Sequence, residues 1–120
     1  MTMPENPSSS PIDHLARYGA PDAAALLIGD RVTTFADLDV GVGRLASWLL
    51  EQAGGPGERV ASWSAKTRLA CLMPLAAARA GLIHVPVNPL LKGPQVAHIL
   101  SDSGAKLLVT NGARAGMLGD

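Results

Sequence analysis

The sequence predicts an α/β fold, a three-layer fragment in which helices wind a small parallel sheet and a β-hairpin precedes it. Beyond the hairpin, short apolar β-prone runs alternate with amphipathic helical stretches, and the connections between them are short. That alternation is typical of parallel strands joined by right-handed crossovers. The chain has 120 residues, of which 48% are apolar and only 17% charged, so it has the composition of a chain with a packed core.

The first residues are expected to lie outside the fold. Residues 1–11 are rich in proline and serine and offer little apolar surface to bury, which predicts a disordered leader. Residues 12–18 then predict one short amphipathic turn of helix, with Ile12, Leu15 and Ala16 on one side. The folded part is therefore expected to begin at about this turn.

A hairpin and a long helix are expected next. Residues 25–28 and 31–33 are β-prone and are separated by a Gly-Asp turn, whose glycine can take positive φ. Thr34 is suited to cap the following helix, Asp37 favours its dipole, and the glycines from Gly54 onward are expected to end it. Apolar residues recur along this helix at spacings of three and four and predict one buried stripe, formed by Phe35, Leu38, Val42, Leu45 and Leu49.

Three apolar runs are expected to form the parallel sheet, at residues 60–63, 82–87 and 106–110. The run 82–87 is almost entirely apolar, as expected for a strand that is covered on both faces. A sheet of this size is small, and its unpaired edges are expected to let the chain self-associate.

Helices are expected between and after these strands. Pro74 lies inside the helix predicted over 67–80, and it is expected to kink that helix or delay its regular start, because proline lacks the amide hydrogen. Pro94 is suited to the first position of the next helix, which Gly104 is expected to end, and residues 113–118 predict a short last helix. The buried side of the helix over 67–80 is expected to consist of Leu69, Leu72, Met73, Ala76 and Ala80.

Three motifs could bind an anion, but packing or capping explains each of them better. Gly41 and Gly43 look like the start of a dinucleotide fingerprint, yet they lie in mid-helix, where glycines let the helix pack closely on the sheet. The strand-to-helix turn over 62–67 has no glycine to bring its backbone close to a phosphate, so its Ser64 or Thr67 side chain is expected to cap the helix. The turn at 110–112 is interpreted in the same way.

Side chains that could catalyse a reaction or bind a metal are scattered. His14, His84 and His98 lack the local spacing typical of a metal site, and His84, in an apolar run, is expected to be a core histidine. The single cysteine, Cys71, is expected to pack as a small apolar residue rather than to act as a nucleophile. Residue types and spacing therefore assign no catalytic, cofactor-binding or metal-binding residue.

The composition excludes several function classes. Lys+Arg and Asp+Glu both number 10, so the formal net charge is zero and argues against nucleic acid as a partner. No apolar run is long enough for a transmembrane helix, and no signal peptide is visible. A lone cysteine cannot form an internal disulfide and fits a reducing compartment. These features predict a cytoplasmic protein.

A series of short motifs recurs in a characteristic order and spacing: TFADL at 34–38, RLA at 44–46, PGERV at 56–60, ARAG at 78–81 leading to VPVNP at 85–89, and HILSDSGAK at 98–106. This series resembles the N-terminal region of AMP-forming acyl-CoA synthetases, which are adenylate-forming enzymes. Within that superfamily, the stretch from VPVNP onward is most similar to the acyl-CoA ligases associated with exosortase systems. The chain departs from the family pattern at Glu58, where aspartate is frequent, and at Ala65, where asparagine is frequent.

The resemblance implies a parent enzyme that activates a carboxylic acid with ATP as an acyl-adenylate and transfers the acyl group to coenzyme A. Such enzymes are several-fold longer, and their phosphate loop, magnesium-binding glutamate, ribose-binding aspartate and C-terminal lysine match no position here. Residues 12–120 would then be the N-terminal part of an AMP-binding domain, truncated and inactive by itself. ATP, magnesium and coenzyme A would belong to the full-length parent, with no cofactor held by the fragment.

Two other functions stay open on the sequence, so it does not decide whether this chain is itself an enzyme. One is a standalone α/β module that binds a nucleotide or an acyl group, which a glycine-bearing strand-to-helix loop would favour. The other is a non-enzymatic interaction protein that pairs through its open sheet edges. A broad thermal transition and binding of a hydrophobic dye are expected for the truncated domain, whereas a sharp melt would favour a self-sufficient module.

Overall fold

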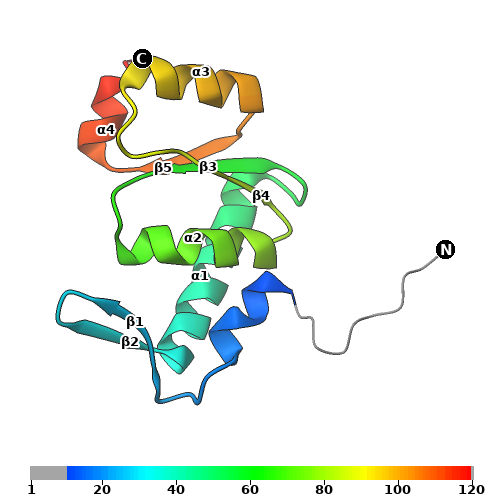
Figure 1. Cartoon of the computed structure of the whole chain (residues 1–120). Coiled ribbons are helices and arrows are strands. Elements are labelled where there is room, and N and C mark those ends of the chain that lie inside the picture. Colours follow the sequence, from blue (N-terminus) through cyan, green and yellow to red (C-terminus); the bar gives the residue numbers. More distant parts are fainter. Residues whose placement is uncertain (1–10, 120) are drawn as a thin grey trace.

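The computed structural model describes residues 11–119 and confirms the predicted α/β architecture (Figure 1). The expected leader lies outside the described residues, apart from Pro11. Strands β1 (Ala24–Ile28) and β2 (Arg31–Thr34) form the predicted antiparallel hairpin, and Gly29 in its turn has a φ of 61°. Only glycine adopts such a φ at little cost, which explains why it occupies this turn.

The segment before the hairpin is a 3₁₀ helix, η1 (Ile12–Arg17), and only part of its predicted buried side is buried. Ala16 is 1% exposed, whereas Ile12 is 60% and Leu15 49% exposed. A 3₁₀ helix has three residues per turn, so residues three apart share a face and the next residue lies on another. Ile12 and Leu15 therefore point outward together, while Ala16 packs into the core.

Helix α1 (Phe35–Ala53) begins and ends where the sequence predicts. The Thr34 hydroxyl accepts a hydrogen bond from the Asp37 amide at 3.1 Å, and Gly54 closes the helix with a φ of 88°. The buried stripe differs from the predicted one, because Phe35 and Leu45 are only half-buried, and Leu45 lies about 60° around the helix from Val42. The stripe consists of Leu38, Val42, Ala46, Leu49 and Ala53.

The sheet contains three parallel strands in the order β4-β3-β5, with bounds Ile83–Pro86 for β4, Arg59–Trp63 for β3 and Leu107–Thr110 for β5. Both edges of β3 are paired, which leaves β4 and β5 as edge strands. The prediction that the run 82–87 is covered on both faces is confirmed for Leu82 and Val87, which are buried, and is wrong for Ile83, which is 49% exposed. Apolar composition alone cannot distinguish a central strand from an edge strand.

Helices cover both faces of this sheet, as the prediction of three layers requires (Figure 1). Helices α1 and α2 (Arg68–Arg79) pack on one face, where Val60 of β3 joins their cluster of buried residues. Helices α3 (Gly93–Ser103) and α4 (Gly112–Met117) lie on the other face, around Trp63 and Val96. Alternating β3 side chains thus supply two separate cores.

Helix α2 begins at Arg68 without the delay that Pro74 was expected to cause, and it continues through that proline. Pro74 is exposed, so its ring lies on the outer side of the helix. Cys71 lies on the same outer side and is exposed, which shows that the prediction of a packed cysteine is wrong. The buried residues of α2 are Leu72, Met73, Leu75, Ala76 and Ala77, while Leu69 and Ala80 are only partly covered.

Within the described part of the chain, no helix has the length and apolar character needed to cross a membrane.

Candidate functional site

The two strand-to-helix turns at residues 62–67 and 110–112 lie side by side at the carboxyl end of the sheet. Strands β3 and β5 are parallel neighbours in which Trp63 pairs with Thr110, so their carboxyl ends coincide. The Thr110 hydroxyl also donates a hydrogen bond to the Trp63 carbonyl oxygen at 2.6 Å. Open α/β sheets bind their ligands beyond the carboxyl ends of the strands, so a binding site is expected at this end of the sheet.

The polar side chains of these turns cap helices, as the sequence predicted. The Thr67 hydroxyl accepts a hydrogen bond from the Ala70 amide at 3.3 Å at the start of α2. The Asn111 side-chain oxygen accepts one from the Arg114 amide at 2.8 Å at the start of α4. These capping groups are occupied by their own helices, and they position the backbone of each turn.

A cleft of about 650 Å³ lies beside these turns, lined by residues of β3, of the β4–α3 loop and of α4. Lys92 and Arg114 give it a positive character, and the Arg114 guanidinium carbon lies 5.9 Å from the centroid of the Trp63 ring. Trp63 is 1% exposed, and its Nε1 has no hydrogen-bond partner among the described residues. The rest of the lining is mostly apolar, and the two basic groups attract an anion and repel a metal cation.

Sequence reasoning missed Lys92 and Arg114 because neither belongs to a motif. Arg114 could have been noticed, since it follows the strand-to-helix turn at 110–112 by only two residues. Nothing in the sequence indicates that Lys92, from another loop, shares its cleft. In the part of the chain that the structure describes, no three His, Cys, Asp or Glu side chains group in a way that could hold a metal ion.

Ser62 and His84 form a close pair between β3 and β4. The Ser62 hydroxyl oxygen and His84 Nε2 are 2.7 Å apart, and Ser62 is almost completely buried. Burial lowers the pKa of His84 below its usual value, because desolvation disfavours the imidazolium. His84 is therefore a half-buried, hydrogen-bonded histidine, as the sequence predicted, and neither residue lines any of the clefts described here.

Acidification is expected to destabilise the fold through His84. Its pKa is lower in the folded chain than the value of 6.5 expected when unfolded, so the unfolded chain binds more protons and stability rises with pH. The melting temperature should fall as pH decreases through about 6.5, and His84→Gln should reduce that dependence. The control is His98→Gln on the exposed side of α3. An unchanged pH dependence in His84→Gln would contradict this prediction.

The mid-helix glycines of α1 pack against arginine side chains of α2, and not against the sheet as expected. A Cβ added at Gly41 would lie 2.8 Å from the Arg68 Nη2 atom. One added at Gly43 would lie 3.6 Å from Arg79 Nη1, an ordinary contact. Gly41 therefore has a packing role, as predicted, but the group that needs the space is the Arg68 guanidinium group, whereas Gly43 has room for a Cβ.

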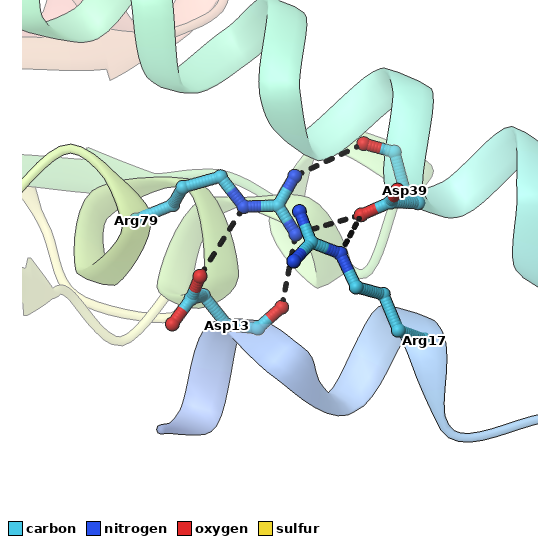
Figure 2. A network of polar contacts seen from close by, with 4 residues as sticks. All are labelled: Asp13, Arg17, Asp39 and Arg79. Atoms are coloured by element: carbon cyan, nitrogen blue, oxygen red, sulfur yellow. Dashed lines mark hydrogen bonds and ion pairs between the residues drawn. The ribbon is translucent and has the colours of Figure 1, made fainter. Parts of the chain in front are cut away.

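Arg79 is the centre of a network of ion pairs that joins η1, α1 and α2 (Figure 2). Its guanidinium group donates to the Asp39 carboxylate at 2.8 Å and to the Asp13 carboxylate at 3.3 Å. It also donates to the backbone carbonyl oxygens of both aspartates. Arg17 donates to the same Asp39 oxygen, Oδ1, at 3.1 Å. Hydrogen bonds from Arg79 lower the pKa of Asp39, so the carboxylate stays ionised and the network holds η1 in place.

Comparison with protein families identifies one that extends over almost the whole described chain. A family described as AMP-binding enzyme matches residues 14–118. A feruloyl-CoA synthase of an Amycolatopsis species is 36% identical over 90 residues, which are 75% of this chain and 18% of that protein. Malpibaldin synthetase of Mortierella alpina is also 36% identical over 90 residues, which are 75% of this chain and 2% of that protein.

Solved structures agree with this assignment. A protein of Rhodopseudomonas palustris that is described, without an established activity, as a long-chain-fatty-acid CoA ligase superposes with a TM-score of 0.80 at 27% identity, covering 92% of this chain and 30% of that one. A fatty acyl CoA synthetase of Mycobacterium tuberculosis superposes with a TM-score of 0.68 at 31% identity, covering 74% of this chain and 18% of that one. This chain therefore belongs to the family of AMP-binding, adenylate-forming enzymes, and it spans between 2% and 30% of the length of these relatives.

Proposed function

We propose that this chain is the N-terminal part of an ATP-dependent acyl-CoA ligase, which forms an acyl-adenylate from a carboxylic acid and transfers the acyl group to coenzyme A. The observation that carries the proposal is the family match over residues 14–118, together with relatives of which the chain spans only 2% to 18%. Residues 12–120 would form the first part of the AMP-binding domain, and residues 1–11 a leader to it.

The proposed contribution of this chain to the complete enzyme is structural and electrostatic. The positively charged cleft of Lys92 and Arg114 lies at the carboxyl edge of the sheet, where it would form one wall of a site for an anionic cosubstrate. These basic groups do not fit the magnesium ion that accompanies ATP, and carboxylates elsewhere in the parent would hold that ion. Because the carboxylates that hold magnesium would lie elsewhere in the parent, the isolated chain is proposed to be inactive.

A carrier protein is the second candidate for the acyl acceptor. Malpibaldin synthetase and the feruloyl-CoA synthase are equally similar to this chain, at 36% identity each. A protein of Salinispora arenicola described as a non-canonical nonribosomal peptide synthetase is 29% identical to this chain over 98 residues. Both acceptors attack the acyl-adenylate through a thiol, so the first half-reaction would be the same in either case.

Three finer assignments accompany the proposal. A cytoplasmic location is supported by the single unbridged cysteine, Cys71. Self-association of the isolated chain is supported by the open edges of β4 and β5, because edge strands present unpaired backbone groups. Membership of the exosortase-associated group stays a prediction from the stretch that begins with VPVNP at residues 85–89.

A chimeric enzyme tests the proposed function. The segment of the Amycolatopsis feruloyl-CoA synthase that matches this chain would be replaced by the corresponding 90 residues of this chain. The chimera is expected to catalyse exchange of pyrophosphate with ATP when ferulate is present, whereas the isolated chain is expected to show only the rate of a boiled sample. The control is the same chimera with Leu49→Asp, which places a charge in the core.

Two results would contradict the proposal. Exchange by the isolated chain above the boiled sample would show that it adenylates acids without the rest of a parent. A chimera that unfolds cooperatively but has no exchange activity would show that the chain does not perform the role of the segment it replaces. Supplying coenzyme A or a phosphopantetheinyl carrier protein to an active chimera then distinguishes the two acceptors by the thioester that forms.

A further inference from the structure

A second cavity shares no lining residue with the cleft of Lys92 and Arg114. It is a groove of about 730 Å³ between the hairpin, α1 and the first turn of α2. Three arginines line it, one from each of these elements: Arg31, Arg44 and Arg68. Asp37 is the single carboxylate among the lining residues. We propose that this groove, called here the arginine groove, binds an aliphatic carboxylate.

The arginine groove carries an excess of positive charge in a chain whose formal net charge is zero. The whole chain has equal numbers of basic and acidic residues, yet three positive groups and one negative group line this one cavity. Among residues 11–119, none of the three arginines belongs to an ion pair, whereas Arg17 and Arg79 both do. Lys66 lines a smaller cavity of about 190 Å³ that shares Arg31 and Arg68 with the groove. The local excess of positive charge attracts an anion.

The apolar lining of the groove defines the rest of the ligand. Three apolar side chains that line this cavity are open to water: Val32 and Val40 are more than half exposed, and Leu69 is 37% exposed. Covering such side chains with a hydrocarbon chain removes apolar surface from water and favours binding. None of the lining residues is aromatic, so the groove offers no platform on which a nucleotide base could stack. An aliphatic tail fits this surface better than a base does.

The anionic group is assigned as a carboxylate because of the donors available. Guanidinium groups bind carboxylates and phosphates alike through two parallel hydrogen bonds, so the choice between these anions depends on the other donors of the site. Phosphate sites in α/β folds depend on backbone amides of glycine-rich turns, and the turn before α2 has no glycine from residue 62 to residue 67. The Arg68 guanidinium group lies close against α1, because its Nη2 atom is 2.8 Å from the place that a Cβ at Gly41 would take. The groove is concave, which favours a single ligand over a flat membrane surface.

This inference rests on the arginine groove alone and does not depend on the proposed function. It is tested by titrating the full chain with decanoate, decanol and decylammonium below their micellar concentrations, while following methyl NMR signals of Val32, Val40 and Leu69. Decanoate is expected to bind saturably and at least tenfold more tightly than the other two compounds. Inorganic phosphate is expected to displace decanoate at least tenfold less effectively than octanoate does.

Two variants separate binding from folding. Arg68→Gln is expected to weaken decanoate binding at least fivefold. Gly41→Ala keeps every charge and favours the helix, but its Cβ displaces the Arg68 guanidinium group, so it is expected to weaken binding at least threefold while raising the melting temperature. The matched controls are Gly43→Ala, whose Cβ makes only an ordinary contact, and Lys106→Gln, which removes an exposed charge elsewhere. Both controls should bind decanoate within twofold of the parent sequence.

Several outcomes would overturn the inference. Equal binding of decanol or decylammonium would show that the groove does not select an anion. Unchanged binding in Arg68→Gln would place the carboxylate elsewhere, as would shifts confined to methyl groups outside the groove. Displacement of decanoate by phosphate as readily as by octanoate would identify a phosphate site instead.

Discussion

Leu49→Ala is expected to lower the free energy of unfolding by about 2–5 kcal/mol, the range for a leucine removed from a packed core. Leu49 is completely buried between α1 and the residues of α2 and β3 that share its cluster. The shorter side chain loses contacts on every side and leaves a cavity that rigid neighbours cannot fill. Urea unfolding followed by tryptophan fluorescence, with the m-value checked, measures the change.

The matched control for this prediction is Leu45→Ala on the same helix. Leu45 lies at the side of the buried stripe and is half-buried, so its truncation is expected to cost about 1–2 kcal/mol. Equal losses of unfolding free energy in the two variants would mean that Leu45 is as buried as Leu49, and hence that α1 is rotated about its axis relative to this structure. A loss below about 0.5 kcal/mol for Leu49→Ala would contradict its place in the core.

Arg79→Ala is expected to cost about 2 kcal/mol, since it leaves two carboxylates without their main partner. The Arg79 side chain is 17% exposed and that of Asp13 16% exposed, so their charges are only partly compensated by water. Asp39 is more exposed and keeps Arg17, which limits the loss. The network joins η1 to both helices (Figure 2), so η1 should lose protection from amide hydrogen exchange before the sheet does.

Two further variants show whether the geometry of Arg79 matters. Arg79→Lys keeps the charge but cannot donate to two carboxylates and two carbonyl oxygens at once, so it is expected to recover less than half of the lost stability. Arg17→Ala removes a side chain that is 54% exposed and should cost less than about 0.5 kcal/mol. Full stability in Arg79→Ala would show that the network contributes nothing to the fold.

Local chemistry let the sequence predict most element boundaries. Thr34 and Thr67 cap the helices that they precede, and Gly54 and Gly104 end helices with positive φ. A capping hydroxyl or a glycine acts on its nearest neighbours, so its effect is visible without knowledge of the rest of the chain. The exposure of Cys71 was not visible in this way, because it depends on which side of α2 meets α1.

The sequence by itself determined the order of helices and strands and the resemblance to the N-terminal part of an AMP-binding enzyme, because these depend on periodicity, capping and short motifs. Only the tertiary structure decided that β4 is an edge strand. The order of strands in a parallel sheet depends on how the crossover connections place distant segments side by side, and no local sequence pattern records that order. The same holds for the arginines. Arg31, Arg44 and Arg68 are spread along a chain of zero net charge, and the packing of hairpin against helices is what gathers them in one groove.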